Sequence, residues 1–469
     1  MFPVSPVFRR AFLVLLTLPL QVTEAQFLQA PWAHADAIVA RVKAPLIPPK
    51  DIDITAFGAL GNGIADCSAA FRNAIDACRR DGGGRVVVPD GVYRTGPIRL
   101  VSRVELHLAG HAIIRFDPDP HRYLPLVLTR WEGVECMNYS SCVYAAGEQD
   151  IAITGTGTLD GGGNDSTWWW WSGKREFGWS TGKSQQGPAR TRLMQMGQDG
   201  VPVDERKMGE GCYLRPGFIQ IQRCSRVLIQ GIRLINSPMW VVHPVLCDNV
   251  TVEDVHVESH GPNNDGCDPE SCRDVVIQGC TFDTGDDCIA IKSGRNNDGR
   301  RLHTPSEEIV IQDCEFRDGH GAVTIGSEVS GGVRDIFARR CRIASPALYS
   351  ALRIKTNAVR GGVVEQVYLR DISVSLVSRA AIDIDLLYEE GKNGDYLPTV
   401  RFISVDSMTV ASCASAFSFV GYEESPLRQI LLRKCVFAGV VNGYTVRNVG
   451  EFRAFLTTIN GREFTPADE

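Results

Sequence analysis

The chain has 469 residues, of which 44% are hydrophobic and 22% are charged, so it can bury a large core. This length would ordinarily indicate two or three domains, although an elongated single domain is an exception to that rule. The formal net charge of −6 gives no reason to expect nucleic acid as a partner. An anionic ligand would need cations gathered at its binding site.

Residues 1–25 have the pattern of a secretory signal peptide. Arg9 and Arg10 precede the apolar run AFLVLLTLPL, and TEA places small residues before a cut after Ala25. The run is short for a membrane span, and no later segment is long and apolar enough. We therefore expect a secreted or periplasmic protein with no membrane contact after cleavage. Residues 26–50, which include several prolines, are expected to form an extended arm.

The chain has fifteen cysteines, an odd number. Cysteines in an exported protein normally indicate disulfides. Cys136 and Cys142, in CMNYSSC, are close enough in sequence to be partners. Most of the others have a different explanation, which is a repeat.

Apolar residues recur at offsets 0, +2, +5 and +7 from a series of starting positions 23 to 36 residues apart. The starts are Val227, Val250, Val275, Ile309, Ile336, Val367, Ile403 and Ile430. Alternation within each half indicates a strand with one buried face, and the change of parity indicates a bend between two strands. Such a period is typical of a solenoid. Cys280, Cys314, Cys341 and Cys435 occupy the +5 position and are expected to be small buried residues.

The segment DCSAAFRNAIDACRRDGGG, upstream of the repeat, predicts a helix. Asp66 is a candidate N-cap and Gly82 ends the helix. One face is apolar and comprises Ala70, Phe71, Ala74, Ile75 and Cys78. Such a helix would cover the open end of a strand solenoid. We predict an all-β fold for residues 51–469, a single parallel β-helix with an N-terminal capping helix.

Three successive turns carry titratable residues at matching positions. Aligning the strings DGCDP, DDCIA and HGAVT places Asp265, Asp286 and His320 one above another, with Asp287 beside them. The sheet spacing separates such positions by roughly 5 Å per turn. Like charges this close raise at least one pKa, which favours a proton donor beside an ionised base. Glycosidic bond hydrolysis requires this pair, whereas the local string GPNNDGCDPESC alone also fits a calcium site or a structural corner.

Cations follow in the next turn. The string ALRIKTN places Arg353 and Lys355 on the strand face opposite Leu352 and Ile354, and Lys355 falls in the column of Lys292. Arginine can hold a carboxylate with two hydrogen bonds, and lysine can hold it as a point charge. These cations could instead only neutralise the aspartates. In an acidic protein, cations concentrated at an acid cluster favour an anionic sugar as substrate.

These motifs resemble those of the polygalacturonases of glycoside hydrolase family 28. NND (263–265), GDD (285–287), GHG (319–321) and RIK (353–355) occur in the family's order. Asn264 is a mild departure, because the first motif usually reads Asn-Thr-Asp. The resemblance extends from AFGALGNGIADCSAAFRNAIDA to SPMWVVHP and covers almost the whole mature chain.

The resemblance implies a right-handed parallel β-helix that hydrolyses α-1,4-galacturonosyl bonds of pectin with inversion and without a metal or cofactor. It implies that Asp286 is the general acid and that Asp265 and Asp287 activate the water. His320 would tune the protonation of the acid. A carboxylate separation of about 5 Å ordinarily predicts retention, so inversion is expected from the resemblance alone.

The resemblance also implies substrate-binding residues. Arg353 and Lys355 would bind the galacturonate carboxylate, and Asn263 would help to shape the site. Lys292 is a further candidate because it shares the column of Lys355, and Tyr388 is a candidate for lining the cleft. The expected partner is a pectic polysaccharide or oligogalacturonide, bound by a monomer.

Several alternatives stay open. A rhamnogalacturonan hydrolase of the same family is the nearest, followed by a calcium-dependent pectate lyase and a non-catalytic carbohydrate-binding solenoid. Endo or exo action depends on whether insertions, such as the loop with Trp168–Trp171 or the loop 388–396, close one end of the cleft. We expect the four tryptophans to be buried rather than sugar-binding, and Trp240 and His243 to be packing residues.

Overall fold

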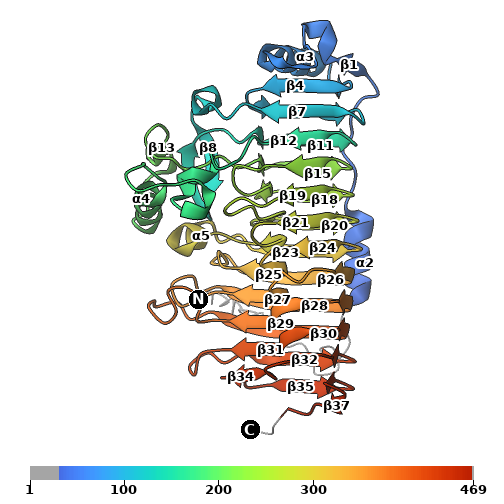
Figure 1. The fold of residues 1–469 in the computed structure, drawn as a ribbon, viewed down its shortest axis with the longest axis vertical. Coiled ribbons are helices and arrows are strands. Elements are labelled where there is room, and N and C mark those ends of the chain that lie inside the picture. The colour runs from blue at the N-terminus through green and yellow to red at the C-terminus, as the bar shows by residue number, and fades with distance from the viewer. Residues whose placement is uncertain (1–30, 467–469) are drawn as a thin grey trace, which may run out of the picture.

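The computed structural model describes residues 31–466, which form one elongated stack of strand turns (Figure 1). The chain winds as a right-handed parallel β-helix, so the predicted fold class is confirmed. The predicted signal peptide, residues 1–25, lies outside the described residues. Within residues 31–466, no helix has both the length and the apolar character needed to cross a bilayer.

Each turn contributes up to three strands, which pair in parallel with strands of the neighbouring turns and form three columns. The first column comprises β1 (Asp51–Asp53), β3 (Gly84–Val88), β6 (Val104–Leu108), β11 (Gln149–Gly155), β15 (Ser225–Gln230), β18 (Asp248–Glu253), β20 (Arg273–Gln278), β23 (Ser306–Gln312), β26 (Val333–Ile343), β28 (Val363–Val374), β30 (Thr399–Val410), β32 (Arg428–Arg433) and β35 (Phe452–Phe455). The last halves of β26, β28 and β30 continue into the second column.

The second column comprises β2 (Asn62–Asp66), β4 (Gly91–Thr95), β7 (Ala112–Phe116), β12 (Thr158–Asp160), β16 (Arg233–Ile235), β19 (His256–Ser259), β21 (Thr281–Thr284), β24 (Glu315–Asp318), β33 (Val436–Phe437) and β36 (Thr458–Ile459), and β37 (Arg462–Glu463) adds an antiparallel end. The third column comprises β5 (Ile98–Arg99), β10 (Val143–Ala146), β14 (Ile219–Gln222), β17 (Val242–Val245), β22 (Ile289–Ile291), β25 (Gly321–Gly326), β27 (Ser350–Lys355), β29 (Val377–Asp385), β31 (Cys413–Val420) and β34 (Thr445–Arg447). Isolated bridges at Cys267 and Glu270 connect the turns that contain β17 and β22.

A left-handed backbone residue explains the change of parity in the repeat. The eight predicted starts pair with one another from turn to turn, from Val227 through to Ile430. The residue four positions after each start has a positive φ, between 52° and 77°. These residues are Gly231, Asp254, Gly279, Asp313, Arg340, Asp371, Ser407 and Lys434. The bend reorients the chain, so the side chains at +5 and +7 again face the core.

The predicted capping helix is α3 (Ser68–Arg80), at one end of the stack in Figure 1. The five residues predicted for its apolar face are its buried residues. The Asp66 carboxylate accepts hydrogen bonds from the Ser68 amide and hydroxyl, at 3.0 and 2.6 Å. The helix therefore closes the apolar column. The N-cap residue is Cys67 rather than the predicted Asp66, which stabilises the first turn from the preceding position.

The prediction of an extended arm for residues 26–50 is wrong where the chain forms helix α2 (Trp32–Arg41). Ala35 and Ile38 are buried against three outward-facing residues of the first column, Val310, Phe337 and Tyr368. Helix α2 lies along the side of the β-helix (Figure 1). The prolines of this segment lie outside the helix, at its start and in residues 42–50, so they do not interrupt it.

The expected Cys136–Cys142 disulfide is not formed. All fifteen cysteines lie within the described residues and are free thiols. The Cys136 sulfur contacts the Thr129 hydroxyl at 3.4 Å, and the Cys142 sulfur contacts the Tyr123 hydroxyl at 3.7 Å. The four cysteines predicted at the +5 position are buried, as expected. Closeness in sequence did not bring the two thiols together, because Cys136 lies in the side lobe described next.

An insertion on one side of the β-helix forms a lobe, visible beside β12 to β23 in Figure 1. It contains β8 (Val127–Trp131), β9 (Val134–Asn138), β13 (Lys207–Met208) and α4 (Gly187–Gln198), and α5 (Asn296–Leu302) packs against it. Short 3-10 helices are η1 (Ile54–Phe57), η2 (Pro120–Tyr123), η3 (Trp169–Ser172), η4 (Arg175–Phe177) and η5 (Val203–Glu205). Trp168 and Trp171 are buried in the main core, as expected, whereas Trp169 and Trp170 are only partly buried against it.

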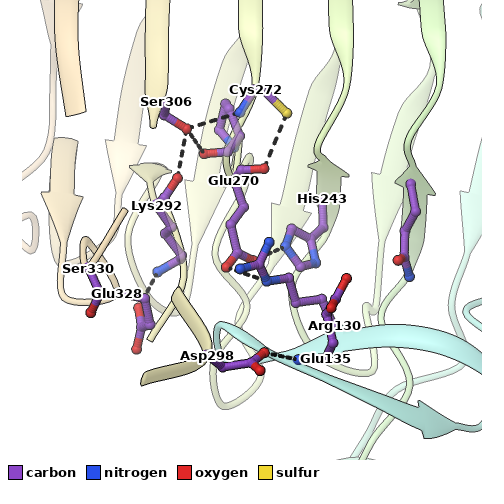
Figure 2. A network of polar contacts seen from close by, with 12 residues as sticks. Arg130, Glu135, His243, Glu270, Cys272, Lys292, Asp298, Ser306, Glu328 and Ser330 are labelled. Atoms are coloured by element: carbon purple, nitrogen blue, oxygen red, sulfur yellow. Dashed lines mark hydrogen bonds and ion pairs between the residues drawn. The ribbon is translucent and has the colours of Figure 1, made fainter. Parts of the chain in front are cut away.

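Buried charges tie the lobe to the β-helix (Figure 2). Arg130 Nε lies 3.0 Å from Glu270 Oε1, and Glu270 Oε2 lies 2.8 Å from His243 Nε2. The Asp298 carboxylate accepts a hydrogen bond from the Glu135 amide at 2.9 Å. Removing one member of such a buried pair leaves the other charge uncompensated, so these contacts fix the position of the lobe.

We predict that Phe71→Ala destabilises the protein by about 3–5 kcal/mol, because Phe71 fills the closed end of the core. The exposed neighbour Arg72 is the control, and Arg72→Ala should change the free energy of unfolding by less than about 0.5 kcal/mol. Urea denaturation of the three proteins measures both values. Equal effects of the two substitutions would contradict the capping role.

Candidate active site

The predicted site residues come from five successive turns and meet at one cleft of about 330 Å3. They lie just before, within or just after strands of the third column. Eight of the nine line the cleft: Asn263, Asp265, Asp286, Lys292, His320, Arg353, Lys355 and Tyr388. The ninth, Asp287, is fully buried next to the cleft and contacts Lys355 and Arg353.

The three carboxylates are gathered as the repeat predicted. One oxygen each of Asp265, Asp286 and Asp287 lies within 4.8 Å of the others. The alignment of Asp286 with His320 is correct, because β22 and β25 pair Ile289 with Val323. The predicted alignment of Asp265 with Asp286 is wrong by one residue.

Cys267 pairs with Ile289, so its register places Asp265 beside Asp287. Isolated bridges at Cys267 and Glu270, rather than a continuous strand, connect these turns, and they allow this shift. The acids still meet, because Asp286 and Asp287 are adjacent in sequence.

Asp286 and His320 form a hydrogen-bonded pair, with His320 Nδ1 2.8 Å from Asp286 Oδ1. Burial acts against charge on both groups. The hydrogen bond and the mutual attraction nevertheless hold the pKa of Asp286 below its usual range and raise the pKa of His320. Lys355 and Lys292 add to the effect on Asp286. The unliganded site therefore favours an ionised Asp286 beside a protonated His320.

A raised pKa, expected of closely spaced acids, occurs at Asp265 rather than at Asp286. Burial and the neighbouring Asp286 raise the pKa of Asp265 to about 7, although Lys292 acts in the opposite direction. Burial also raises the pKa of Asp268 well above its usual value. Asp268 lies close to the same Lys292 and stands outside the predicted set. Below about pH 7 the acid cluster thus retains at least one proton.

The positive charges of Lys355 and Arg353 compensate the negative charge of the buried Asp287. Lys355 Nζ lies 2.7 Å and Arg353 Nη1 3.6 Å from the Asp287 carboxylate, which also accepts a hydrogen bond from Thr324 at 3.0 Å. The Tyr388 ring lies beside both cations, 5.3 Å from Lys355 Nζ and 5.6 Å from Arg353 Cζ. Lys355 therefore supports the fold as well as lining the cleft.

Lys292 shares its column with Lys355, as predicted, because Ile291, Ile325 and Ile354 pair in register. Its ammonium group is buried and lies 3.5 Å from Asp265, 3.6 Å from Asp268 and 3.3 Å from Glu328. Figure 2 shows it reaching toward Glu328. These three carboxylates already balance its charge, so its main electrostatic effect falls on the acid cluster.

Asn263 is held by an arginine that sequence reasoning did not predict. Asn263 has φ of 55°, and its Oδ1 accepts a hydrogen bond from Arg215 Nη2 at 2.7 Å. Arg215 is fully buried and also donates to the carbonyl of Pro238 at 3.1 Å. Arg215 therefore fixes the position of the first motif, NND (263–265).

Sequence reasoning missed part of the cleft wall. Trp240 is buried but lines the cleft, with Lys292 Nζ 4.4 Å from its ring centroid, so its expected role in packing was incomplete. His243 is buried and hydrogen-bonded, consistent with the expectation. The other unpredicted lining residues are Glu132, Arg190, Arg295, Ser327, Glu328, Tyr349, Arg379 and Glu389. Several come from insertions that carry no repeat signal.

The acid cluster has the oxygen donors for a divalent cation, but its environment does not favour one. Asp265, Asp286 and Asp287 present oxygens within 4.8 Å of one another. Lys355 and Lys292 lie against the same oxygens, and their charges would repel a cation. A partly exposed group of His260, Asp283 and Asp318 also has metal-ligating atoms near one another.

A cleft that combines a carboxyl–imidazole pair, a second acid with a raised pKa and a row of cations has the groups needed to cleave a glycosidic bond in an acidic sugar. The model of glycosyl hydrolases family 28 matches residues 202–419. The crystal structure of a hyperthermoactive exopolygalacturonase from Thermotoga maritima is 42% identical, covers 93% of this chain and 97% of its own, and superimposes with a TM-score of 0.90.

Two curated relatives support the same family. A probable polygalacturonase of Vitis vinifera is 29% identical, over 80% of this chain and 72% of its own length. An exo-poly-alpha-D-galacturonosidase of Dickeya chrysanthemi is 26% identical, over 75% of this chain and 59% of its own. The protein is a glycoside hydrolase. Within that class it belongs to glycosyl hydrolases family 28, which confirms the resemblance seen in the motifs.

We predict that Asp265→Asn changes the pH dependence of stability. Since the pKa of Asp265 rises from 3.8 to about 7 on folding, the folded state binds more protons than the unfolded state between these values. Wild-type stability therefore falls as pH rises through this window, by on the order of 1 kcal/mol per pH unit from this group. The variant lacks this loss, so its stability relative to wild type should increase from pH 4 to pH 8.

Denaturation curves across that pH range measure the difference. Asp204→Asn, at an exposed position, is the matched control and should show a flat difference. A flat or opposite trend for Asp265→Asn would contradict the raised pKa.

Proposed function

We propose that this protein hydrolyses the α-1,4-galacturonosyl bonds of polygalacturonate, starting from a chain end. The observation that carries the proposal is the cleft itself, in which the Asp286–His320 pair lies next to Arg353 and Lys355. The likeness to the Thermotoga maritima exopolygalacturonase, over nearly the full length of both chains, supports the substrate.

Asp286 is the proposed general acid because its carboxyl group is the most accessible of the three. Its side chain is 19% exposed, whereas those of Asp265 and Asp287 are 5% and 0% exposed. Because the pKa of Asp265 is raised to about 7, Asp265 favours its protonated form below that pH in the unliganded site. Moving that proton to Asp286 creates an acid and a base without exchange with solvent.

A bound galacturonate favours this proton transfer. Its carboxylate, held by Arg353 and Lys355, adds a negative charge near Asp286, and a nearby negative charge raises the pKa of an acid. Asp286 then gives its proton to the leaving oxygen, and ionised Asp265, assisted by Asp287, accepts a proton from the attacking water. His320 holds Asp286 in position through its 2.8 Å hydrogen bond.

The stereochemistry is proposed to be inverting, as the family resemblance implies. The spacing of the carboxylates in the unliganded cleft is that of a retaining site, so the inference does not rest on distance. NMR of the first-formed product tests it. An initial excess of the β-anomer from the α-linked substrate supports inversion, and an initial excess of the α-anomer overturns it.

Exo action is supported by the side lobe. The lobe contributes Glu132 and Arg190 to the cleft wall, and it lies alongside the turns that precede the site (Figure 1). Glu132 accepts hydrogen bonds from Arg190 at 2.7 Å and from Arg295 at 3.4 Å, which join lobe and β-helix across the wall. Such a wall would stop a polymer from running past the acids in that direction.

We further infer that residues 51–469 act as one monomeric catalytic domain outside the cytoplasm. The signal-peptide pattern of residues 1–25 supports secretion or export to the periplasm. A pectic polysaccharide or its fragments would be met there.

We predict that Asp286→Asn lowers kcat on polygalacturonate by at least about 100-fold, because an amide cannot donate the required proton. Folding and oligogalacturonate binding should persist, since the side chain keeps its size and its place beside His320. Reducing-sugar release, circular dichroism and calorimetric titration measure the three properties. Turnover close to wild type would remove the acid assignment.

The product profile tests the exo inference. We predict that a single short product appears from the first minutes of digestion and that the viscosity of polygalacturonate falls slowly. Chromatography of early time points, together with viscometry, provides the measurement. An early ladder of oligomers with a rapid loss of viscosity would show internal cleavage.

A further inference from the structure

Three side chains on successive turns form a stacked column along the cleft. The Tyr349 amide donates to the His320 carbonyl at 3.2 Å, and the Arg379 amide donates to the Tyr349 carbonyl at 3.1 Å. The His320 and Tyr349 rings are 4.6 Å apart and tilted by only 11°. Arg379 Cζ lies 3.9 Å from the centroid of the Tyr349 ring. All three residues line the cleft.

The other cations of the cleft are paired with carboxylates. Arg190 and Arg295 contact Glu132, Lys292 contacts three acids, and Lys355 contacts Asp287. Arg353 pairs with Asp287 at 3.6 Å and with Asp383 at 4.0 Å.

Arg379 differs, since no carboxylate of residues 31–466 lies within 4.0 Å of its guanidinium. Asp383 is close enough for Arg379 to affect its pKa, but it forms its ion pair with Arg353. The guanidinium is exposed, and a planar cation stacked on an aromatic ring keeps its N–H groups available at the edges. The guanidinium of Arg379 is therefore available to bind an anionic group of a ligand.

We propose that Arg379, supported by Tyr349, binds the carboxylate of a second galacturonate unit in the substrate chain. This inference rests on the proposed function and extends it. Arg379 lies two turns from His320, roughly 10 Å along the stack, so it serves a different sugar from the one beside Asp286. It lies on the opposite side of the acids from the lobe, where the remainder of the polymer extends. The enzyme thereby distinguishes a uronate from a neutral sugar at two positions.

Kinetics of Arg379→Ala on two substrates test the proposal. Digalacturonate carries two carboxylates, whereas 4-nitrophenyl α-galacturonide carries one carboxylate and a neutral leaving group. For digalacturonate the variant should lose about tenfold in kcat/KM, mainly through a higher KM, because one charge-assisted contact is lost. For the nitrophenyl substrate kcat/KM should stay within twofold of wild type.

Two further variants sharpen the result. Arg379→Lys keeps the charge without the planar fork and should recover part of the loss on digalacturonate. Arg317→Ala removes an exposed arginine of β24 that does not line the cleft, and it should leave both substrates unaffected.

An unchanged KM for digalacturonate in Arg379→Ala would overturn the proposal, as would an equal loss on both substrates. Failure of the proposed function is distinguishable. In that case the wild-type protein itself would not cleave digalacturonate or polygalacturonate, whereas failure of this inference leaves wild-type cleavage intact.

Discussion

Parallel hydrogen bonding between successive turns fixes where every side chain of this protein can lie. Each turn sits about 4.8 Å from the next, so residues at matching positions must form columns. In the core the columns are apolar and add to stability. At the cleft the same spacing brings Asp286 under His320 and Asp265 beside Asp287, where like charges cannot be moved apart. The chemistry of the site is a consequence of this enforced proximity.

The acids are tolerated because cations lie in the neighbouring columns. Lys355 compensates Asp287, and Lys292 compensates Asp265, both in a buried setting where an unpaired charge is costly. These lysines therefore contribute to the stability of the fold, and Lys355 is in addition proposed to bind substrate. A Lys355→Met substitution would remove a cation that is proposed to bind the substrate carboxylate. In the structure it would also leave Asp287 without its closest partner, so loss of folding would accompany loss of binding.

The periodic features were predictable from the sequence. The eight starts, the buried face of α3 and the meeting of the four motifs all follow from spacing, because each turn repeats the same local pattern. Features set by long-range contacts were not predictable. Helix α2 depends on an apolar patch around Phe337 that faces away from the core, and the cleft-lining residues Glu132 and Arg190 come from an insertion with no repeat. The offset at Cys267 arises where a strand is replaced by isolated bridges at Cys267 and Glu270, which leave no periodic signal.

The free cysteines have a consequence for how the chain reaches its native state. Some of them form ladders, in which the Cys224 amide approaches the Cys247 sulfur at 3.4 Å and the Cys247 amide approaches the Cys272 sulfur at 3.4 Å. Burial raises the pKa of Cys247 and of other thiols, which suppresses the reactive thiolate. No covalent crosslink has to form or reshuffle among residues 31–466, so assembly requires no oxidant. The stability of the finished β-helix accordingly rests on packing and hydrogen bonds rather than on disulfide bridges.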